Sequence, residues 1–116
     1  MINWHWVKKE ASAVFSTRLQ NEQTDNLARS FLALESMEDC YRLFEDLFTI
    51  REIQDLSQRL EVAQLLQSQA TYTEIVEKTG VSTATIGRVN RALNYGAGGY
   101  QLVLERIAEK QEDDKA

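Results

Sequence analysis

The stretch "TYTEIVEKTGVSTATIGRVNRALNYG" (residues 71–96) decides the fold. It begins with Thr71 in a Thr-x-x-Glu pattern, whose side chains can bond the free backbone N–H groups at a helix start. Gly80 is a natural left-handed end for that helix, and Ser82 can cap a second one. The pattern therefore predicts a helix-turn-helix over residues 72–94.

The inner face of this motif is apolar at each position that packing of the two helices requires. Ile75 lies on the first helix, Val81 follows the glycine, and Ile86 and Val89 lie on the second helix. One position departs from the usual pattern, because Val76 stands where a small residue normally lets the helices meet. The four matches predict that the motif packs as a unit.

The outer face of the second helix is small at its start and cationic further along. A helix that enters a major groove presents its first turn to the base edges, and small side chains there permit close approach. Arginines further along can bond guanine edges or phosphates. A glycine inside a helix costs about 1 kcal/mol relative to alanine, which indicates that something packs against this face. The candidate DNA-binding residues are Ser82, Thr83, Ala84, Thr85, Gly87, Arg88 and Arg91.

The charge distribution leaves two functions open. The chain of 116 residues has a net charge of −5, yet residues 79–96 contain two arginines and no acid. An acidic chain is a poor general binder of polyanions, but it can still carry one local contact surface for DNA. The alternative is a protein–protein interaction module that uses the helical hairpin or the acidic N-terminal helices without binding DNA.

The rest of the chain reads as helices within a single domain over residues 1–116. Proline is absent and glycine is confined to residues 80–99, so few positions would interrupt a helix. We expect a helical extension over 1–24, a turn at "NEQTDN" (21–26), a helix capped by Ser36 and a flexible tail over 109–116. Apolar residues at helical spacing lie within 7–19, 27–34, 40–48, 53–66 and 100–107.

Other kinds of site find little support. One cysteine, Cys40, and one histidine, His5, cannot form a disulfide within the chain or a zinc cluster. His5 between Trp4 and Trp6 is either a ligand or part of an anchor on a partner subunit. No nucleophile–base motif or phosphate loop stands out, so we expect no enzyme activity, no cofactor and no metal. Without a signal peptide or a membrane span, the expected compartment is the cytoplasm.

The sequence resembles a known bacterial family. The stretches "EIQDLSQRLEVA" (52–63), "STATIGRVNRALNYG" (82–96) and "GYQLVLER" (99–106), together with "CYRLFEDL" (40–47), are similar to the Trp repressor superfamily, in particular its YerC/YecD branch. The resemblance implies an all-α fold of six or so helices that forms an intertwined homodimer. It also implies a regulator, such as a repressor, that binds double-stranded DNA.

The resemblance also raises the question of tryptophan, which Trp repressors hold between two arginines. Arg88 matches one of these arginines, and Arg59 matches the other if one residue is gapped between them. The family's pocket glycine is Val89 here, and the serine that helps to hold the amino group is Ala92. We therefore expect a degenerate corepressor pocket, filled by the valine, that does not bind free tryptophan; any other effector is unknown.

Overall fold

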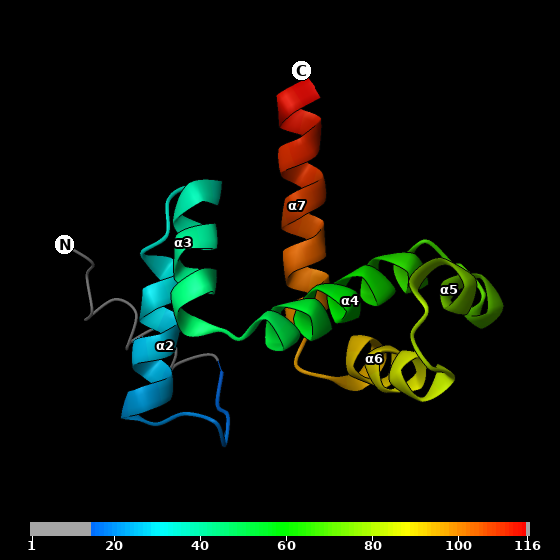
Figure 1. Ribbon diagram of the computed structural model, residues 1–116, viewed down its shortest axis with the longest axis horizontal. Coiled ribbons are helices and arrows are strands. Elements are labelled where there is room, and N and C mark those ends of the chain that lie inside the picture. Colours follow the sequence, from blue (N-terminus) through cyan, green and yellow to red (C-terminus); the bar gives the residue numbers. More distant parts are fainter. Residues whose placement is uncertain (1–14, 116) are drawn as a thin grey trace. The chain divides into compact units, whose positions relative to one another are not determined.

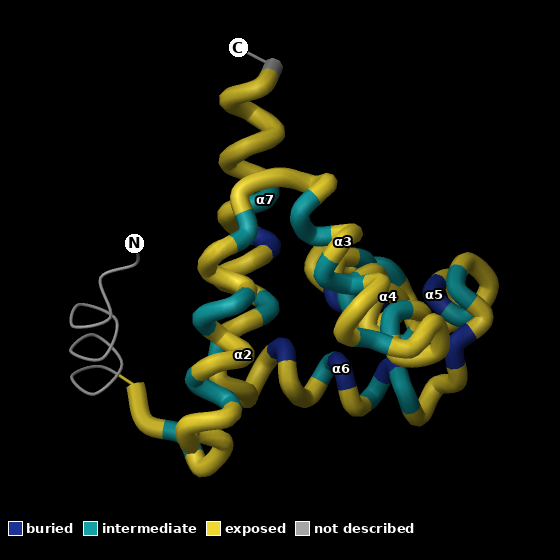
Figure 2. The backbone as a smooth tube through the Cα atoms, turned by 60° about the vertical axis from the view of Figure 1, so that its left-hand side comes forward, coloured by how far each residue is buried: buried dark blue, intermediate teal, exposed yellow. Residues whose placement is uncertain are grey.

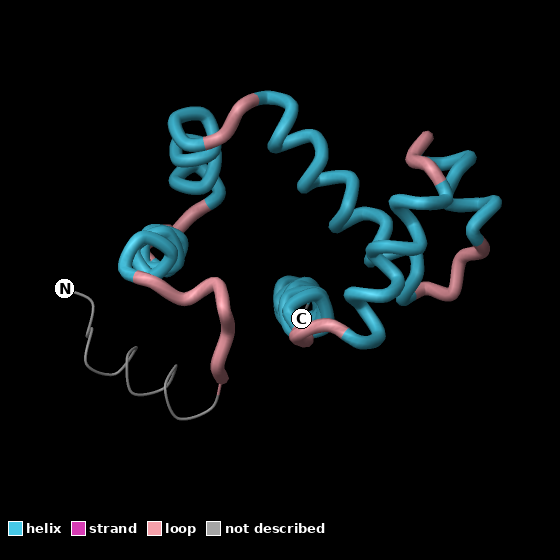
Figure 3. The backbone as a smooth tube through the Cα atoms, turned by 90° about the horizontal axis from the view of Figure 1, so that it is seen from below, coloured by secondary structure: helices cyan, strands magenta, loops and turns pink. Residues whose placement is uncertain are grey.

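The computed structural model describes residues 15–115, and all of its regular structure is helical (Figures 1 and 3). The described residues form two compact units, 15–48 and 49–115. The predicted all-α class is confirmed, whereas the single domain stays a prediction. Within residues 15–115, no helix combines the length and the apolar character that a membrane-spanning segment needs.

The first unit contains two short helices, α2 (Glu22–Leu32) and α3 (Met37–Leu47). Each begins at a polar cap. The Asn21 side chain accepts a hydrogen bond from the backbone of Thr24, and Ser36, as predicted, accepts one from Asp39. These bonds satisfy backbone N–H groups that have no partner inside the helix. Local polar contacts therefore define where both helices start.

Two N-terminal predictions are wrong where the structure tests them. The helix expected to run through Phe15 and Leu19 is absent from residues 15–20. The part of the predicted extension before residue 15, including His5, lies outside the described residues. Phe15 and Leu19 are exposed, and an amphipathic helix without packing is only marginally stable. The expected turn at residues 21–26 is instead a helix start, since Asn and Thr are favoured at helix caps as well as in turns.

The second unit begins with its longest helix, α4 (Ile50–Gln67). Thr49 caps it in a reciprocal pair with Glu52, a Thr-x-x-Glu signal that the sequence analysis missed. At its other end, Gln69 has a left-handed φ of 65°, and the backbone N–H of Ala70 bonds the carbonyl of Leu65. This is the Schellman arrangement that closes many helices.

The next two helices are α5 (Tyr72–Thr79) and α6 (Thr83–Tyr95), which agree with the predicted helix-turn-helix to within a residue. Thr71 and Ser82 cap them as expected, and Gly80 has a φ of 75°. The left-handed backbone at Gly80 is one that residues with a side chain rarely adopt. Gly80 and Ser82 therefore set the geometry of the turn, and Thr71 fixes where α5 begins.

The last helix, α7 (Gly99–Lys115), follows a short turn that contains Gly98 at a φ of 86°. It runs across α4, so that Figure 3 shows α7 end-on and α4 lengthwise. The expected flexible tail over 109–116 is helical as far as Lys115. The residues of this stretch are mostly Glu, Lys and Gln, whose intrinsic helix propensity is high.

The core of the described residues lies in α4 to α7 (Figure 2). Helix α4 packs against α5, α6 and α7, and α6 also packs against α5 and α7. No residue of α2 or α3 is buried. The buried side chains are Val62, Ala63, Ile75, Val81, Ile86, Val89, Leu93 and Leu104.

Candidate nucleic-acid interface and adjoining cavity

The two faces of α6 differ in burial as the sequence predicts. Ile86 is fully buried, and Val89 and Leu93 are 3% and 8% exposed. Val76, the unusual position on α5, is half-buried and packs against the same core. The larger residue is therefore accommodated, and the two helices still meet.

The first turn of α6 is organised by its cap. The Ser82 hydroxyl accepts a bond from the backbone N–H of Thr85 (3.2 Å) and donates to its side-chain oxygen (3.1 Å). Thr83 and Ala84 are exposed beside it, and no acidic residue lies in this turn. The N-terminus of a helix carries a partial positive charge, so this turn favours an anion such as a phosphate.

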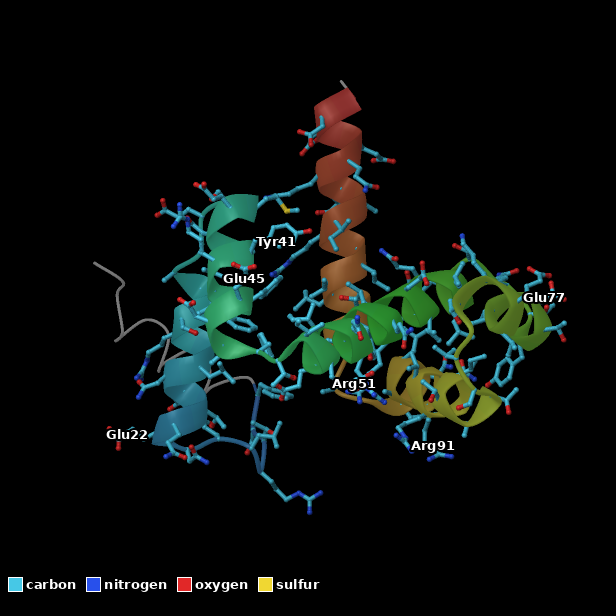
Figure 4. The ribbon with its side chains drawn as sticks, viewed as in Figure 1. Glu22, Tyr41, Glu45, Arg51, Glu77 and Arg91 are labelled. Carbon is cyan, nitrogen blue, oxygen red and sulfur yellow. The ribbon has the colours of Figure 1, made fainter. Side chains whose placement is uncertain are left out.

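The two arginines of α6 are exposed and available. Within residues 15–114, neither Arg88 nor Arg91 has a hydrogen bond or an ion pair. Figure 4 shows the Arg91 side chain extending from α6 away from α4, whereas Glu77 extends from α5 in another direction. Both cations of α6 are exposed, and neither forms an ion pair with a carboxylate of the described residues.

Gly87 lies on α6 directly before Arg88. A Cβ placed on Gly87 would meet no atom of the described structure within 4 Å beyond its immediate backbone. Packing inside the chain therefore does not require glycine here, although glycine weakens a helix by about 1 kcal/mol relative to alanine. The open space leaves room for an external surface to approach the helix backbone.

A cavity of about 480 Å³ lies between α4 and α6, next to this face. Its volume is in the range of small-molecule sites, roughly 300–1,000 Å³. All four residues predicted for the degenerate corepressor pocket line it. The complete lining is Asp55, Gln58, Arg59, Val81, Thr85, Arg88, Val89, Ala92 and Tyr100.

The cavity differs from the filled slot that the sequence analysis expects. Val89 packs into the core, as expected, but it forms part of the wall and leaves the space beside it open. Core residues hold α4 and α6 together, and the cavity lies beside this core with Asp55, Gln58 and Arg59 in its lining. Ala92 lacks a hydroxyl that could bond an amino group.

Five lining residues were not predicted for the pocket: Val81 and Thr85, which were expected in the core and on the DNA-binding face, and Asp55, Gln58 and Tyr100. Asp55 and Gln58 share a helix face with Arg59, a spacing of three and four residues that could have revealed them. Tyr100 comes from α7, and its place in the wall depends on the turn at Gly98. Asp55 is also in an ion pair with Arg51, with 3.6 Å between nitrogen and oxygen.

These features define an all-helical protein with a helix-turn-helix whose second helix exposes cations. The sequence matches the family model for the Trp repressor protein over residues 22–108. The chain therefore belongs to the Trp repressor family. The family is one of DNA-binding regulators.

Individual relatives agree with this assignment. The chain is 48% identical over 99 residues to the uncharacterized protein YerC of Bacillus subtilis (strain 168), covering 85% of this chain and 95% of that protein. The crystal structure of a TrpR like protein from Eubacterium eligens ATCC 27750 matches with a TM-score of 0.76 and 48% identity, over 80% of this chain and 96% of that one. A Staphylococcus aureus crystal structure matches with a TM-score of 0.75 and 43% identity over the same shares. The resemblance and the fold are confirmed.

Proposed function

We propose that this protein is a sequence-specific regulator of transcription that reads the major groove of DNA with α6. The observation that carries this proposal is the division of α6 into a buried apolar face and an exposed face with two unpaired arginines. The contact residues would be the seven predicted from the sequence. In this role the protein would act in the cytoplasm, where bacterial DNA lies.

The proposed roles differ along α6. Ser82 already uses its hydroxyl as the cap, so its contribution would be to hold the first turn in place. Thr83, Ala84 and Gly87 would allow the helix to approach the base edges closely. Arg88 and Arg91 would bond guanine edges or phosphates, because a guanidinium presents several donors in a planar fork.

We further propose that the DNA-binding form is a homodimer. Several large apolar side chains of α2 and α3 are more than two-fifths exposed, among them Phe31, Leu32, Met37 and Tyr41. Exposed apolar side chains gathered on two short helices mark an interaction site. A symmetric dimer would present two copies of α6 roughly 34 Å apart, one turn of DNA, and so match a palindromic site.

We also propose that free tryptophan is not the effector. The support is local, because Val89 stands in the cavity wall and Ala92 offers no hydroxyl for an amino group. Calorimetry with tryptophan should give no saturable heat at micromolar concentrations. Saturable micromolar binding would contradict this part of the proposal and leave DNA binding intact.

The central test is selection of bound sequences from a randomised duplex library, followed by titration of the enriched duplex. Binding should weaken as salt rises, because cations that contact phosphates displace condensed counterions. Arg88→Ala and Arg91→Ala should each weaken binding roughly tenfold or more, since one good base contact contributes about 1–3 kcal/mol.

The matched control for this test is Arg42→Ala. Arg42 is an exposed arginine on α3, paired with Glu38 at 3.6 Å and absent from the proposed surface. Its replacement should leave DNA binding unchanged. If no duplex is enriched, or if Arg88→Ala and Arg91→Ala bind the enriched duplex as tightly as the wild type does, α6 is not the reading helix.

A further inference from the structure

A polar contact on the side of α6 ties the reading helix to the first residue of α5. The Asn90 side-chain amide donates to the Tyr72 hydroxyl across 3.3 Å. Within residues 49–114, it is the one hydrogen bond between side chains that joins two different helices. The bond therefore links α5 and α6 at a point outside their shared apolar core.

A second residue fixes the orientation of Asn90. The Asn94 amide donates to the Asn90 side-chain oxygen (2.8 Å) and to its backbone oxygen (2.9 Å). Because the oxygen of the Asn90 side chain is occupied by a donor, its NH₂ group is the end that faces Tyr72. The three side chains form a chain from the start of α5 to the last turn of α6.

This chain differs in kind from the packing beneath it. The contacts of Ile75, Val81, Ile86 and Val89 are apolar, and apolar attraction has no preferred direction. A hydrogen bond weakens steeply when its donor and acceptor are misaligned. The apolar core thus holds the inner face of α6 against its neighbours, and the polar chain adds a directional contact between α5 and α6 outside that core.

We propose that Tyr72, Asn90 and Asn94 form a tether that positions α6 for base reading and so determines sequence discrimination. The inference rests on the proposed function of α6. Hydrogen bonds to base edges demand a defined helix orientation, whereas a flexible arginine can follow a phosphate through small rotations. Loss of the tether should therefore weaken specific binding and spare non-specific binding.

The test measures the DNA affinity of the wild-type protein, Tyr72→Phe and Asn90→Ala. Each protein is titrated with two duplexes: one that the wild type enriches from a random library, and one with a scrambled sequence. Each variant should weaken binding to the enriched duplex roughly fivefold or more. Binding to the scrambled duplex should stay the same. The double variant should be no worse than either single one, because both remove the same interaction.

The matched control is Tyr95→Phe. Tyr95 is the last residue of α6, is 87% exposed, and forms no hydrogen bond through its hydroxyl within the described residues. Its replacement should leave both affinities unchanged. If Tyr95→Phe loses as much preference for the enriched duplex as Tyr72→Phe does, the proposed role of the tether is wrong.

Two further outcomes separate this inference from the proposed function. In the first outcome, the wild type prefers the enriched duplex, and Tyr72→Phe and Asn90→Ala show the same preference. This result would contradict the proposed role of the tether and leave the proposed function standing. In the second outcome, the variants lose affinity for both duplexes equally and also have a lower melting temperature. This result would contradict the inference as well, because it would show that the tether only stabilises the fold. If the wild type itself shows no preference, the proposed function fails and the inference fails with it.

Discussion

The two units of this chain begin their helices in the same way and differ in what holds them together. In residues 15–48, polar caps start both helices, and the aromatic rings of Phe31, Phe44 and Phe48 form pairs with centroids 6.0–6.4 Å apart. No residue of these helices is buried, whereas each helix of residues 49–115 contributes to a buried core. Helices that begin with similar polar caps can therefore differ in whether they pack into a buried core.

The largest expected effect comes from separating the units. A fragment of residues 49–116 should keep its helices and unfold cooperatively, because its core lies within it. A fragment of residues 15–48 should lose most of its helix, since short helices without a core are marginal in water. Circular dichroism during thermal unfolding checks both. A cooperative transition in the shorter fragment would contradict the expected difference in stability between the two units.

The next largest effect should come from single substitutions in the two units. Ile86→Ala removes a fully buried side chain and should lower the free energy of unfolding by about 2–5 kcal/mol. Leu32→Ala, at a side chain that is 62% exposed, should lower it by less than about 0.5 kcal/mol at low protein concentration. Urea titrations measure both values.

The same leucine also tests the proposed dimer. At high protein concentration, its replacement should become more destabilising, because association stabilises the folded state by mass action. An effect of Leu32→Ala that does not depend on concentration would show that this side chain takes no part in a dimer.

A smaller effect concerns two glycines of the second unit. Gly87→Ala should raise the free energy of unfolding by about 1 kcal/mol, since the new methyl group meets open space in a helix. It should at the same time weaken DNA binding if the helix backbone approaches the duplex. Gly80→Ala is the contrast, because a left-handed φ costs an ordinary residue about 1–2 kcal/mol. If Gly87→Ala stabilises the protein without weakening DNA binding, Gly87 is not part of the DNA interface.

The smallest effect distinguishes the capping boxes of the two units. Hydrogen bonds from the Thr49 backbone and side chain lower the pKa of Glu52 from its ordinary value of 4.5. A lowered pKa in the folded state stabilises the protein above the unfolded pKa, and this contribution is lost as pH falls through the folded value. The box of α2 has Thr24 in place of a carboxylate and should not respond.

Unfolding titrations between neutral pH and pH 3 would measure this contribution in the wild type and in Glu52→Gln. The variant should lack the part of the acid dependence that Glu52 provides, and Thr24→Ala should retain it. Identical acid dependence in Glu52→Gln and the wild type would contradict the role of the Thr49 pair.

Much of the fold could be predicted from local signals. The caps at Ser36, Thr71 and Ser82 and the stop at Gly80 were confirmed because each acts within four residues of itself. The errors also arose locally, since Asn21 belongs to a residue type that suits both turns and helix caps. Apolar spacing near Phe15 predicted a helix, but spacing shows only what could be buried.

The candidate site was partly predictable for the same reason. The inner and outer positions of α6 follow from a period of 3.6 residues, so Ile86 and Arg88 were assigned to the correct faces. The Asn90 bond to Tyr72 joins residues 18 positions apart, and no short pattern contains it. The same holds for Tyr100 in the cavity wall, which depends on the path of α7.

Local signals in the sequence located the starts of α3, α5 and α6, the end of α5 and the apolar face of α6, because capping bonds and helical periodicity act between near neighbours. Only the tertiary structure decided which apolar faces are buried, that a cavity stays open beside Val89, and that Asn90 reaches Tyr72. The physical reason is that burial and cavities depend on how helices distant in sequence pack together, and no local bond specifies that packing.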